Sequence, residues 1–163
     1  MDPLFPLSFT LNGKPVQQEV SVRTSLADML RHQIGLTATH LGCEQGSCGA
    51  CNVVVNGKVV RSCLIFAIQM EDAEIETSEG ISNDPVMDAL RDNFAQRNAL
   101  QCGFCTGGML LSARELLAKS PKPDRTEIRE HISGNFCRCT GYEAIVDAIW
   151  KTAHEATGSV GAE

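Results

Sequence analysis

The sequence predicts an α+β protein made of two small domains, a strand-rich domain over residues 1–80 and a helical domain over residues 81–163. Two Asn-Gly pairs, each flanked by apolar residues typical of strands, predict two hairpins in the first half. Apolar residues recur at helical spacing through the second half. The eight cysteines divide four and four between the halves, and domains of this size often need a metal centre for stability.

In the first domain, residues 7–11 alternate apolar and polar side chains, as in a half-buried strand, and the turn at Asn12-Gly13 leads into a return strand. A helix follows, with Thr24 or Ser25 as its cap. A loop rich in glycine and cysteine runs from Gly42 to Cys51. Residues 53–60 predict the second hairpin, and residues 73–77 a last short strand. The apolar face of the helix is formed by Leu26, Met29, Leu30 and Ile34.

Four helices are expected in the second domain. Asp84 as N-cap and Pro85 as first residue begin one helix, with Val86, Leu90 and Phe94 on its buried face. Residues 109–119 form the next, and Asp124 with Glu127 resembles a capping box for the third. Residues 142–154 form the fourth, and the tail from residue 157 is expected to fray. The inward side chains of the last two helices are Ile128, Ile132, Ile145, Val146, Ile149 and Ala153.

Charge and hydropathy exclude several classes of protein. A net charge of −6, the lack of a basic block and the presence of one Trp and one Tyr argue against nucleic-acid binding. No apolar run approaches the length of a membrane span, about 18 residues. The N-terminus lacks the pattern of a secretion signal, so we expect a cytoplasmic protein. Eight cysteines in a reducing compartment indicate metal or redox chemistry rather than disulfides.

The first cysteine set is Cys43, Cys48, Cys51 and Cys63, with the spacing C-x4-C-x2-C-x11-C. This is the plant-type arrangement for a [2Fe–2S] cluster, in which a tight loop delivers three thiolates and a later residue delivers the fourth. Glycines in the loop allow backbone N–H groups to point at the sulfurs. A zinc site with four cysteines is the alternative, but zinc ligands usually come as close pairs, so the spacing favours iron–sulfur.

The second set is Cys102, Cys105, Cys137 and Cys139. Two pairs of this kind could hold zinc or a [2Fe–2S] cluster. The C-x-C spacing weakly favours iron–sulfur, because this spacing is rare among zinc ligands. The helix that follows Gly108 is expected to direct the positive end of its dipole at an anionic cluster.

Three motifs resemble those of the molybdenum hydroxylase (xanthine oxidase) family. They are GCEQGSCGAC over residues 42–51, QCGFCTGGM over 101–109 and GNFCRCTGY over 134–142. They occur in the family's order and keep all eight cysteines in register, and the likeness spans roughly residues 7–155. The family usually has Pro where this chain has Gly107, which is expected to loosen the loop without removing a ligand. The chain is similar to the separate small iron–sulfur subunit of bacterial three-subunit enzymes.

The resemblance implies a plant-ferredoxin-like β-grasp domain followed by a four-helix bundle, with one [2Fe–2S] cluster in each. It also implies a large subunit with a molybdopterin cofactor and a medium subunit with FAD, in a heterotrimer that could itself pair as a dimer of heterotrimers. Electrons would pass from molybdopterin through the C-terminal and then the N-terminal cluster to FAD. Gln101 and Cys139 would lie beside the pterin, and this chain alone would turn over no substrate.

Two other functions compete with this relay subunit: a free-standing two-cluster ferredoxin, and a zinc-stapled binding module. The helical domain with Gln101 favours the relay. Substrates of the family include aromatic N-heterocycles, aldehydes, carbon monoxide and aromatic acyl-CoA thioesters. Phe104 and Phe136 flank predicted ligands, so they either shield the clusters or pack in the core. The four histidines are interpreted as surface or capping residues.

Overall fold

The first hairpin forms where the sequence predicts it. In the computed structural model, which describes residues 3–155, strand β1 (Leu4–Leu11) pairs antiparallel with β2 (Lys14–Ser21). Asn12 and Gly13 form the turn with φ of 50° and 75°, values that an Asn-Gly pair adopts readily. Leu7, Phe9 and Leu11 alternate toward the core, as expected.

A sheet of five strands carries the first domain, in the order β2-β1-β5-β3-β4. The short strand β5 (Glu74–Glu76) lies between the two hairpins, parallel to β1 and antiparallel to β3. The helix predicted from Leu26 onward is capped by Ser25, whose Oγ accepts from Asp28 N at 3.0 Å. It begins as α1 (Leu26–Asp28) and continues as the π-helical turn η1 (Met29–Gln33), which the apolar spacing did not reveal.

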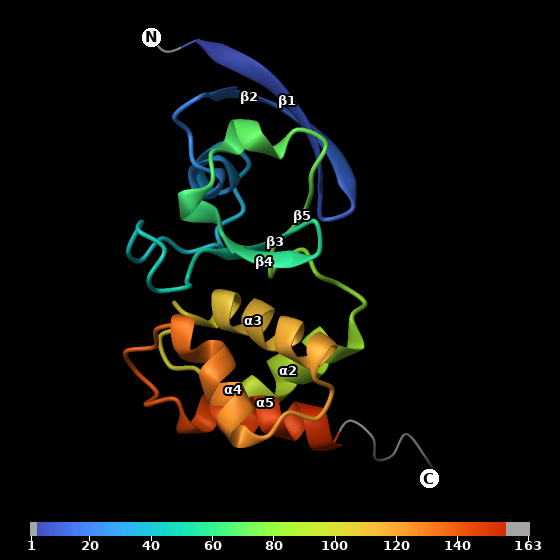
Figure 1. Cartoon of the computed structure of the whole chain (residues 1–163), viewed down its shortest axis with the longest axis vertical. Helices are drawn as coiled ribbons and strands as arrows, with labels where there is room; N and C mark the ends of the chain where they lie inside the picture. The colour runs from blue at the N-terminus through green and yellow to red at the C-terminus, as the bar shows by residue number, and fades with distance from the viewer. Residues whose placement is uncertain (1–2, 156–163) are drawn as a thin grey trace.

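The second hairpin lies between the two halves of the molecule. Strand β3 (Asn52–Val55) pairs with β4 (Lys58–Arg61) around a second Asn-Gly turn. Val53 packs into the core of the first domain, whereas Val54 packs into the core of the helical half. Because both faces of this strand are buried, its sequence contains an unbroken run of apolar residues. In Figure 1 the hairpin lies directly above α3.

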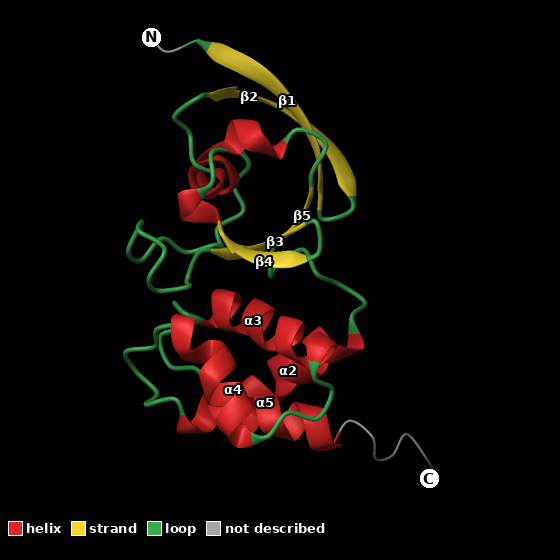
Figure 2. Ribbon diagram, viewed as in Figure 1, coloured by secondary structure: helices red, strands yellow, loops and turns green. Residues whose placement is uncertain are grey.

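The second half is built from four helices, as predicted: α2 (Pro85–Gln96), α3 (Thr106–Lys119), α4 (Arg125–His131) and α5 (Glu143–Glu155). They share one hydrophobic core that includes Ile128, Ile132, Ile145 and Ile149. Figure 2 shows the strands confined to one half of the molecule and these helices to the other. Short 3-10 turns complete the described chain: η2 (Ser62–Leu64), η3 (Ala67–Met70) and η4 (Ile132–Gly134). The α+β class is therefore confirmed.

Three details of the helical half differ from the prediction. Met87, and not Val86, joins Leu90 and Phe94 in the core, while Val86 is 40% exposed. Helix α3 begins at Thr106, three residues earlier than expected from Met109, because Cys105 already serves as its N-cap. Tyr142 lies before α5 with φ of 70°, a conformation that cannot continue a helix.

The caps of the helical half follow the sequence more closely. Asp84 caps α2, and Asp124 caps α4 by accepting from Thr126 N and Glu127 N, each at 2.8 Å. Among the described residues, no helix is both long and apolar enough to cross a membrane. The tail predicted to fray, from residue 157, lies outside the described residues.

Candidate iron–sulfur sites

The first cysteine set lies on the loop between η1 and β3 and on the turn after β4. Three residues of this loop have positive φ, Glu44 at 53°, Gly46 at 80° and Gly49 at 75°. These conformations curl the backbone inward, so that Cys48 N lies 3.4 Å from Cys43 Sγ. Cys63 joins from η2. The structure therefore brings all four predicted ligands to one loop region, with Cys51 buried at its base.

The four sulfurs of this set fall into two neighbouring pairs, Cys43 with Cys48 and Cys51 with Cys63. The backbone N–H groups of Gln45 and then Cys48 stabilise the thiolate and lower the pKa of Cys43 to about 7. Burial, followed by the neighbouring Cys51 thiol, raises the pKa of Cys63 to about 11. The loop thus already offers N–H donors to one of its sulfurs.

The second set lies at the N-terminus of α3 and on the loop between η4 and α5. Its sulfurs also pair, with Cys139 Sγ 3.5 Å from Cys102 Sγ and with Cys105 beside Cys137. Thr140 Oγ1 lies 3.1 Å from Cys137 Sγ and can donate to it. Backbone N–H of Cys137 in turn donates to the hydroxyl of Tyr142 at 2.9 Å. Two distant segments of the chain are therefore joined at this site.

The thiols of the second set are also unequal. Burial, followed by the adjacent Cys137 thiol, raises the pKa of Cys105 to about 12. Burial opposes ionisation of Cys137 as well, but hydrogen bonds from the Thr140 hydroxyl and N–H outweigh it and lower the pKa of that thiol. In each set, hydrogen-bond donors favour ionisation of one thiol, Cys43 or Cys137, whereas burial disfavours ionisation of another, Cys63 or Cys105. A bound metal cation would balance the charge of the buried thiolate.

The donor sets fit two [2Fe–2S] clusters. A cluster of this type has two irons with two thiolates on each, and the sulfurs here come as two pairs per set. All eight cysteines are free thiols. Within residues 3–155, the one buried side-chain oxygen or nitrogen without a hydrogen-bond partner is Thr106 Oγ1, next to Cys105. No group of three or more Cys, His, Asp or Glu in this range is gathered to hold a single metal ion.

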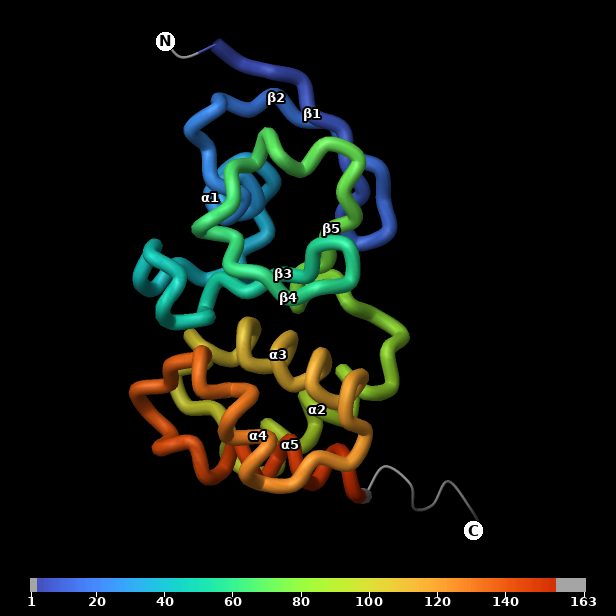
Figure 3. Tube along the Cα trace, viewed as in Figure 1, coloured from blue at the N-terminus to red at the C-terminus, as the bar shows by residue number. Residues whose placement is uncertain are grey.

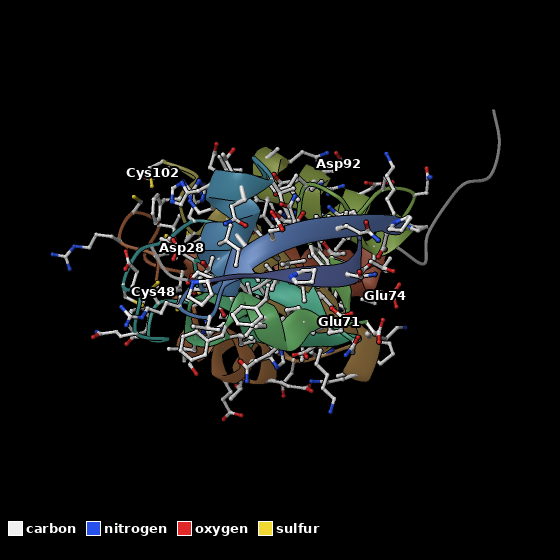
Figure 4. All side chains as sticks on the ribbon, turned by 90° about the horizontal axis from the view of Figure 1, so that it is seen from above. Asp28, Cys48, Glu71, Glu74, Asp92 and Cys102 are labelled. Carbon is white, nitrogen blue, oxygen red and sulfur yellow. The ribbon has the colours of Figure 1, made fainter. Side chains whose placement is uncertain are left out.

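Both sites lie along one side of the molecule. Figure 3 traces the loop before β3 to the same side as the loops that precede α3 and α5. Seen from above in Figure 4, Cys48 and Cys102 lie on this side, away from Glu74 and Asp92. Gln101 is exposed, as are the adjacent Cys102 and the distant Cys139, so these three predicted residues lie together at the surface.

The surroundings of the residues that flank the predicted ligands decide between shielding and core packing for two phenylalanines, and they locate Gly107. Phe104 and Phe136 are 44% and 56% exposed, so they cover the loops from outside and do not pack in the core. The ring of His40 stacks on Phe104 with centroids 4.6 Å apart, and its Nδ1 lies 2.9 Å from Phe104 O. Gly107 lies in the first turn of α3, where an added Cβ would be 2.9 Å from Ala38 O. It is part of a close contact and not of a loose loop.

Sequence reasoning missed the polar residues that support the cysteine loops. Thr140 follows the C-x-C pair directly, so its position beside a ligand was a usable signal. Asn52 and Arg61 pair across the β3–β4 hairpin, and Asn52 directly follows Cys51. Their contacts with Ser112 and Gly134 carried no signal, because these form only through the packing of the two halves. Within residues 3–155, Arg138, between two predicted ligands, forms no hydrogen bond and no ion pair.

Two family models together cover most of the chain. The family described as "2Fe-2S iron-sulfur cluster binding domain" matches residues 9–83, and the family described as "[2Fe-2S] binding domain" matches residues 77–150. The chain thus contains two [2Fe–2S]-binding domains, one for each cysteine set.

Named relatives match nearly the whole chain. The caffeine dehydrogenase subunit gamma of Pseudomonas sp. (strain CBB1) is 46% identical over 88% of this chain and 87% of its own. The nicotine 6-hydroxylase small subunit of Paenarthrobacter nicotinovorans is 46% identical over 93% and 88%. Among solved structures, a chain of quinoline 2-oxidoreductase from Pseudomonas putida 86 matches with a TM-score of 0.89 and 52% identity, covering 94% of this chain and 95% of that one.

Proposed function

Since the chain belongs to the small iron–sulfur subunits of the molybdenum hydroxylase family, we propose that it carries electrons from a molybdopterin cofactor in a large subunit to FAD in a medium subunit. The observation that carries this proposal is the presence of eight free thiols in two paired sets, one set in each [2Fe–2S]-binding domain.

We assign the N-terminal cluster to Cys43, Cys48, Cys51 and Cys63 and the C-terminal cluster to Cys102, Cys105, Cys137 and Cys139. The sulfur pairs support one iron for each pair. When bound, each cluster supplies a carrier for one electron. The residues of the chain hold the thiolates, shield them and donate hydrogen bonds to them. We further propose domains over residues 1–80 and 81–163, of β-grasp and four-helix-bundle type.

The exposure of the two sites supports the proposed direction of transfer. Gln101, Cys102 and Cys139 are exposed together, which suits close approach of a pterin to the C-terminal site. Beside the N-terminal site, Leu64 and Phe66 are 61% and 52% exposed. Such side chains are typical of a protein–protein contact, so this face suits the medium subunit. Electrons would therefore enter at the C-terminal site and leave at the N-terminal one.

The names of three relatives support a proposal for the class of substrate and for the assembly. Caffeine, nicotine and quinoline are all nitrogen-containing ring compounds, so we propose that the complex acts on an aromatic N-heterocycle in its large subunit. Two of the relatives are named as subunits, which supports a heterotrimer, and two heterotrimers could pair. Eight free thiols suit a cytoplasmic location, where the reducing environment keeps them available.

Metal analysis combined with two single-ligand variants tests the proposal. We expect about four irons and four acid-labile sulfides per matured chain, because two clusters of this type hold two of each. Cys43→Ser should disturb only the N-terminal signal in paramagnetic resonance of the reduced protein, and Cys105→Ser only the C-terminal one. Stoichiometric zinc, or loss of both signals from either folded variant, would contradict the assignment. Co-purification with two larger subunits separates a relay subunit from a free ferredoxin.

A further inference from the structure

A cluster of buried polar side chains lies at the contact between the two cysteine loops. Asn52 begins β3, Ser112 lies in α3, and Asn135 follows η4. Their exposed fractions are 2%, 5% and 3%. Polar groups are rarely buried this deeply at a domain contact unless every group has a partner, because each unpaired group costs free energy.

The three side chains form a continuous chain of hydrogen bonds. Asn52 Nδ2 donates to Ser112 Oγ at 2.9 Å and to Gly108 O at 3.3 Å. Ser112 Oγ donates to Asn135 Oδ1 at 2.9 Å, and Asn135 Nδ2 reaches Gly49 O at 3.5 Å. Each amide therefore uses both its oxygen and its nitrogen, since Asn52 Oδ1 accepts from Arg61.

Arg61, at the end of β4, extends this network to the cysteine loops themselves. Its guanidinium donates to Asn52 Oδ1, to Gly134 O at 2.8 Å and, through Nε, to Gly46 O at 3.3 Å. Gly46 lies between two predicted ligands of the N-terminal cluster, and Gly134 precedes the C-x-C pair of the C-terminal one. The guanidinium of Arg61 thus joins both cysteine loops. We call Arg61, Asn52, Ser112 and Asn135 the interdomain latch.

Close backbone contact at two glycines shows how tightly the latch holds the domains. A Cβ added to Gly108, in the first turns of α3, would lie 2.1 Å from Gly49 O. A Cβ at Gly49 would in turn lie 2.7 Å from Asn135 Nδ2. Neither approach leaves room for a methyl group. The backbone of the N-terminal cysteine loop therefore lies directly against α3.

A backbone hydrogen bond also links the two predicted ligand sets at this contact. The N–H of Phe136 donates to Cys48 O at 2.8 Å. Cys48 is a predicted ligand of the N-terminal cluster, and Phe136 is bonded directly to Cys137, a predicted ligand of the C-terminal one. A route from one thiolate to the other therefore runs through covalent bonds and this one hydrogen bond. Its length depends on the register of the two domains.

We propose that the interdomain latch positions the two cysteine loops so that an electron crosses between the cluster sites by way of the Phe136–Cys48 hydrogen bond. This proposal rests on the proposed electron-transfer function and deepens it. In the crossing, one electron leaves the C-terminal site, which is oxidised, and arrives at the N-terminal site, which is reduced. No bond is broken and no proton moves. The four latch side chains act as positioning residues. They add directional hydrogen bonds to a domain contact whose apolar part includes Val54, and burial of apolar surface is by itself non-directional.

Two variants of the iron-loaded full chain test the latch. Ser112→Ala removes the central hydroxyl and strands the buried Oδ1 of Asn135. Gly108→Ala inserts a methyl group against Gly49 O, although it improves the intrinsic helix propensity of α3. The matched control is Thr152→Val, which removes an equally buried hydroxyl from α5, where Thr152 Oγ1 donates to Ala148 O at 2.9 Å.

Each variant is characterised by four measurements. The first two are the rate of electron transfer between the sites after rapid one-electron reduction and the magnetic interaction between the two reduced sites. The other two are the reduction potential of each site and the hydrogen exchange of the Phe136 amide. We expect slower transfer and a weaker magnetic interaction in Ser112→Ala and Gly108→Ala, with both potentials unchanged. The Phe136 amide should exchange about fivefold faster in Ser112→Ala, which corresponds to the loss of one buried hydrogen bond. Thr152→Val should match the wild type in all four.

The outcomes separate this proposal from the proposed function. Wild-type transfer rates and magnetic interaction in an iron-loaded Ser112→Ala chain would overturn the latch alone. So would an equal loss of both in Thr152→Val. If Gly108→Ala fails to fold, Ser112→Ala decides the matter. A wild-type chain that matures without iron would overturn the proposed function, and the latch proposal with it.

Discussion

At the scale of single residues, two threonine hydroxyl groups lie next to predicted ligands of the C-terminal cluster, and we expect them to adjust its reduction potential. Thr140 Oγ1 lies 3.1 Å from Cys137 Sγ and accepts from Tyr142 N at 3.1 Å, which fixes its direction. A donor to a ligand sulfur stabilises the extra negative charge of a reduced cluster, so its removal lowers the potential. Such a bond is worth about 1 kcal/mol, or about 40 mV for one electron.

We therefore predict that Thr140→Val lowers the potential of the C-terminal cluster by about 40 mV and leaves the N-terminal potential unchanged. A redox titration followed by paramagnetic resonance measures both potentials in the same sample. Thr152→Val is again the control, because its hydroxyl is buried far along α5. An unchanged C-terminal potential would mean that Thr140 does not donate to the ligand in the loaded protein.

Thr106 provides a second prediction of this kind. Its Oγ1 is the buried side-chain atom that lacks a partner within residues 3–155, and it follows the predicted ligand Cys105. A buried hydroxyl without a partner is unfavourable unless a bound group completes it. We expect it to donate to a sulfur of the C-terminal cluster, so that Thr106→Val also lowers that potential by roughly 40 mV. The same titration would show no shift if the hydroxyl has no acceptor there.

At the scale of secondary-structure elements, Asp84 joins three parts of the molecule. Its Oδ1 accepts from Val86 N at 2.9 Å and Met87 N at 3.1 Å, which caps α2. Its Oδ2 accepts from Arg114 Nε of α3 at 2.5 Å, and Arg114 also reaches Glu76 of β5 at 3.2 Å. Burial opposes ionisation of Asp84, but the hydrogen bond and charge of Arg114 and the N–H groups of Met87 and Val86 together outweigh it, so the pKa of this carboxyl is lowered.

We predict that Asp84→Ala destabilises the chain by about 1 kcal/mol for the lost cap, with up to about 1 kcal/mol more for the ion pair. Asp84→Asn should keep most of the cap and lose the ion pair. Because the folded pKa is lowered, the charge stabilises the fold fully above the ordinary carboxyl pKa, and this contribution is lost as the pH falls through the lowered value.

Thermal unfolding of the iron-loaded chain measures these effects. Asp124→Ala is the matched control, since Asp124 caps α4 with the same two backbone bonds. At neutral pH, Asp84→Ala should lower the midpoint more than Asp124→Ala does. The difference between wild type and Asp84→Asn should shrink as the pH is lowered toward the lowered pKa. Equal midpoints for the two alanine variants at neutral pH would argue that the Arg114 pair adds nothing.

Turns and helix caps that depend on a few neighbouring residues were predicted correctly. Both Asn-Gly turns, the Ser25 cap and the Asp84 and Asp124 caps follow from short-range chemistry, and all are present. Errors arose where tertiary packing decides. Val86 and Met87 are both apolar neighbours at the start of α2, and only the position of the other helices places Met87 inside. The π-helical continuation of α1 likewise has no distinct apolar spacing.

At the scale of the whole molecule, the candidate sites and their connection differ in how far the sequence predicts them. The cysteine spacings depend on local loops, so the sets could be assigned before any fold was known. The interdomain latch could not be assigned in this way. Asn52 and Ser112 are 60 residues apart, and Arg61 and Gly134 are 73 apart. Asn, Ser and Arg are also common at surfaces, so only the stacking of the β3–β4 hairpin on α3 gives them a role (Figure 1).

The last prediction concerns the chain within its complex. Gln101 is exposed at the edge of the C-terminal site, next to Cys102. Cys139 is exposed too, and its Sγ lies 3.5 Å from Cys102 Sγ. If this surface meets the pterin, Gln101→Ala should slow reduction of the clusters by the large subunit while both cluster signals stay intact. Loss of one hydrogen bond costs about 1 kcal/mol, which corresponds to roughly a fivefold slowing.

The control is Gln17→Ala, because Gln17 is an exposed glutamine on β2 at the opposite end of the molecule. Rapid mixing of the complex with substrate measures the reduction rate. An unchanged rate in Gln101→Ala, under conditions where this step limits the wild type, would exclude the contact, and substrate turnover by the isolated chain would contradict its role as a relay.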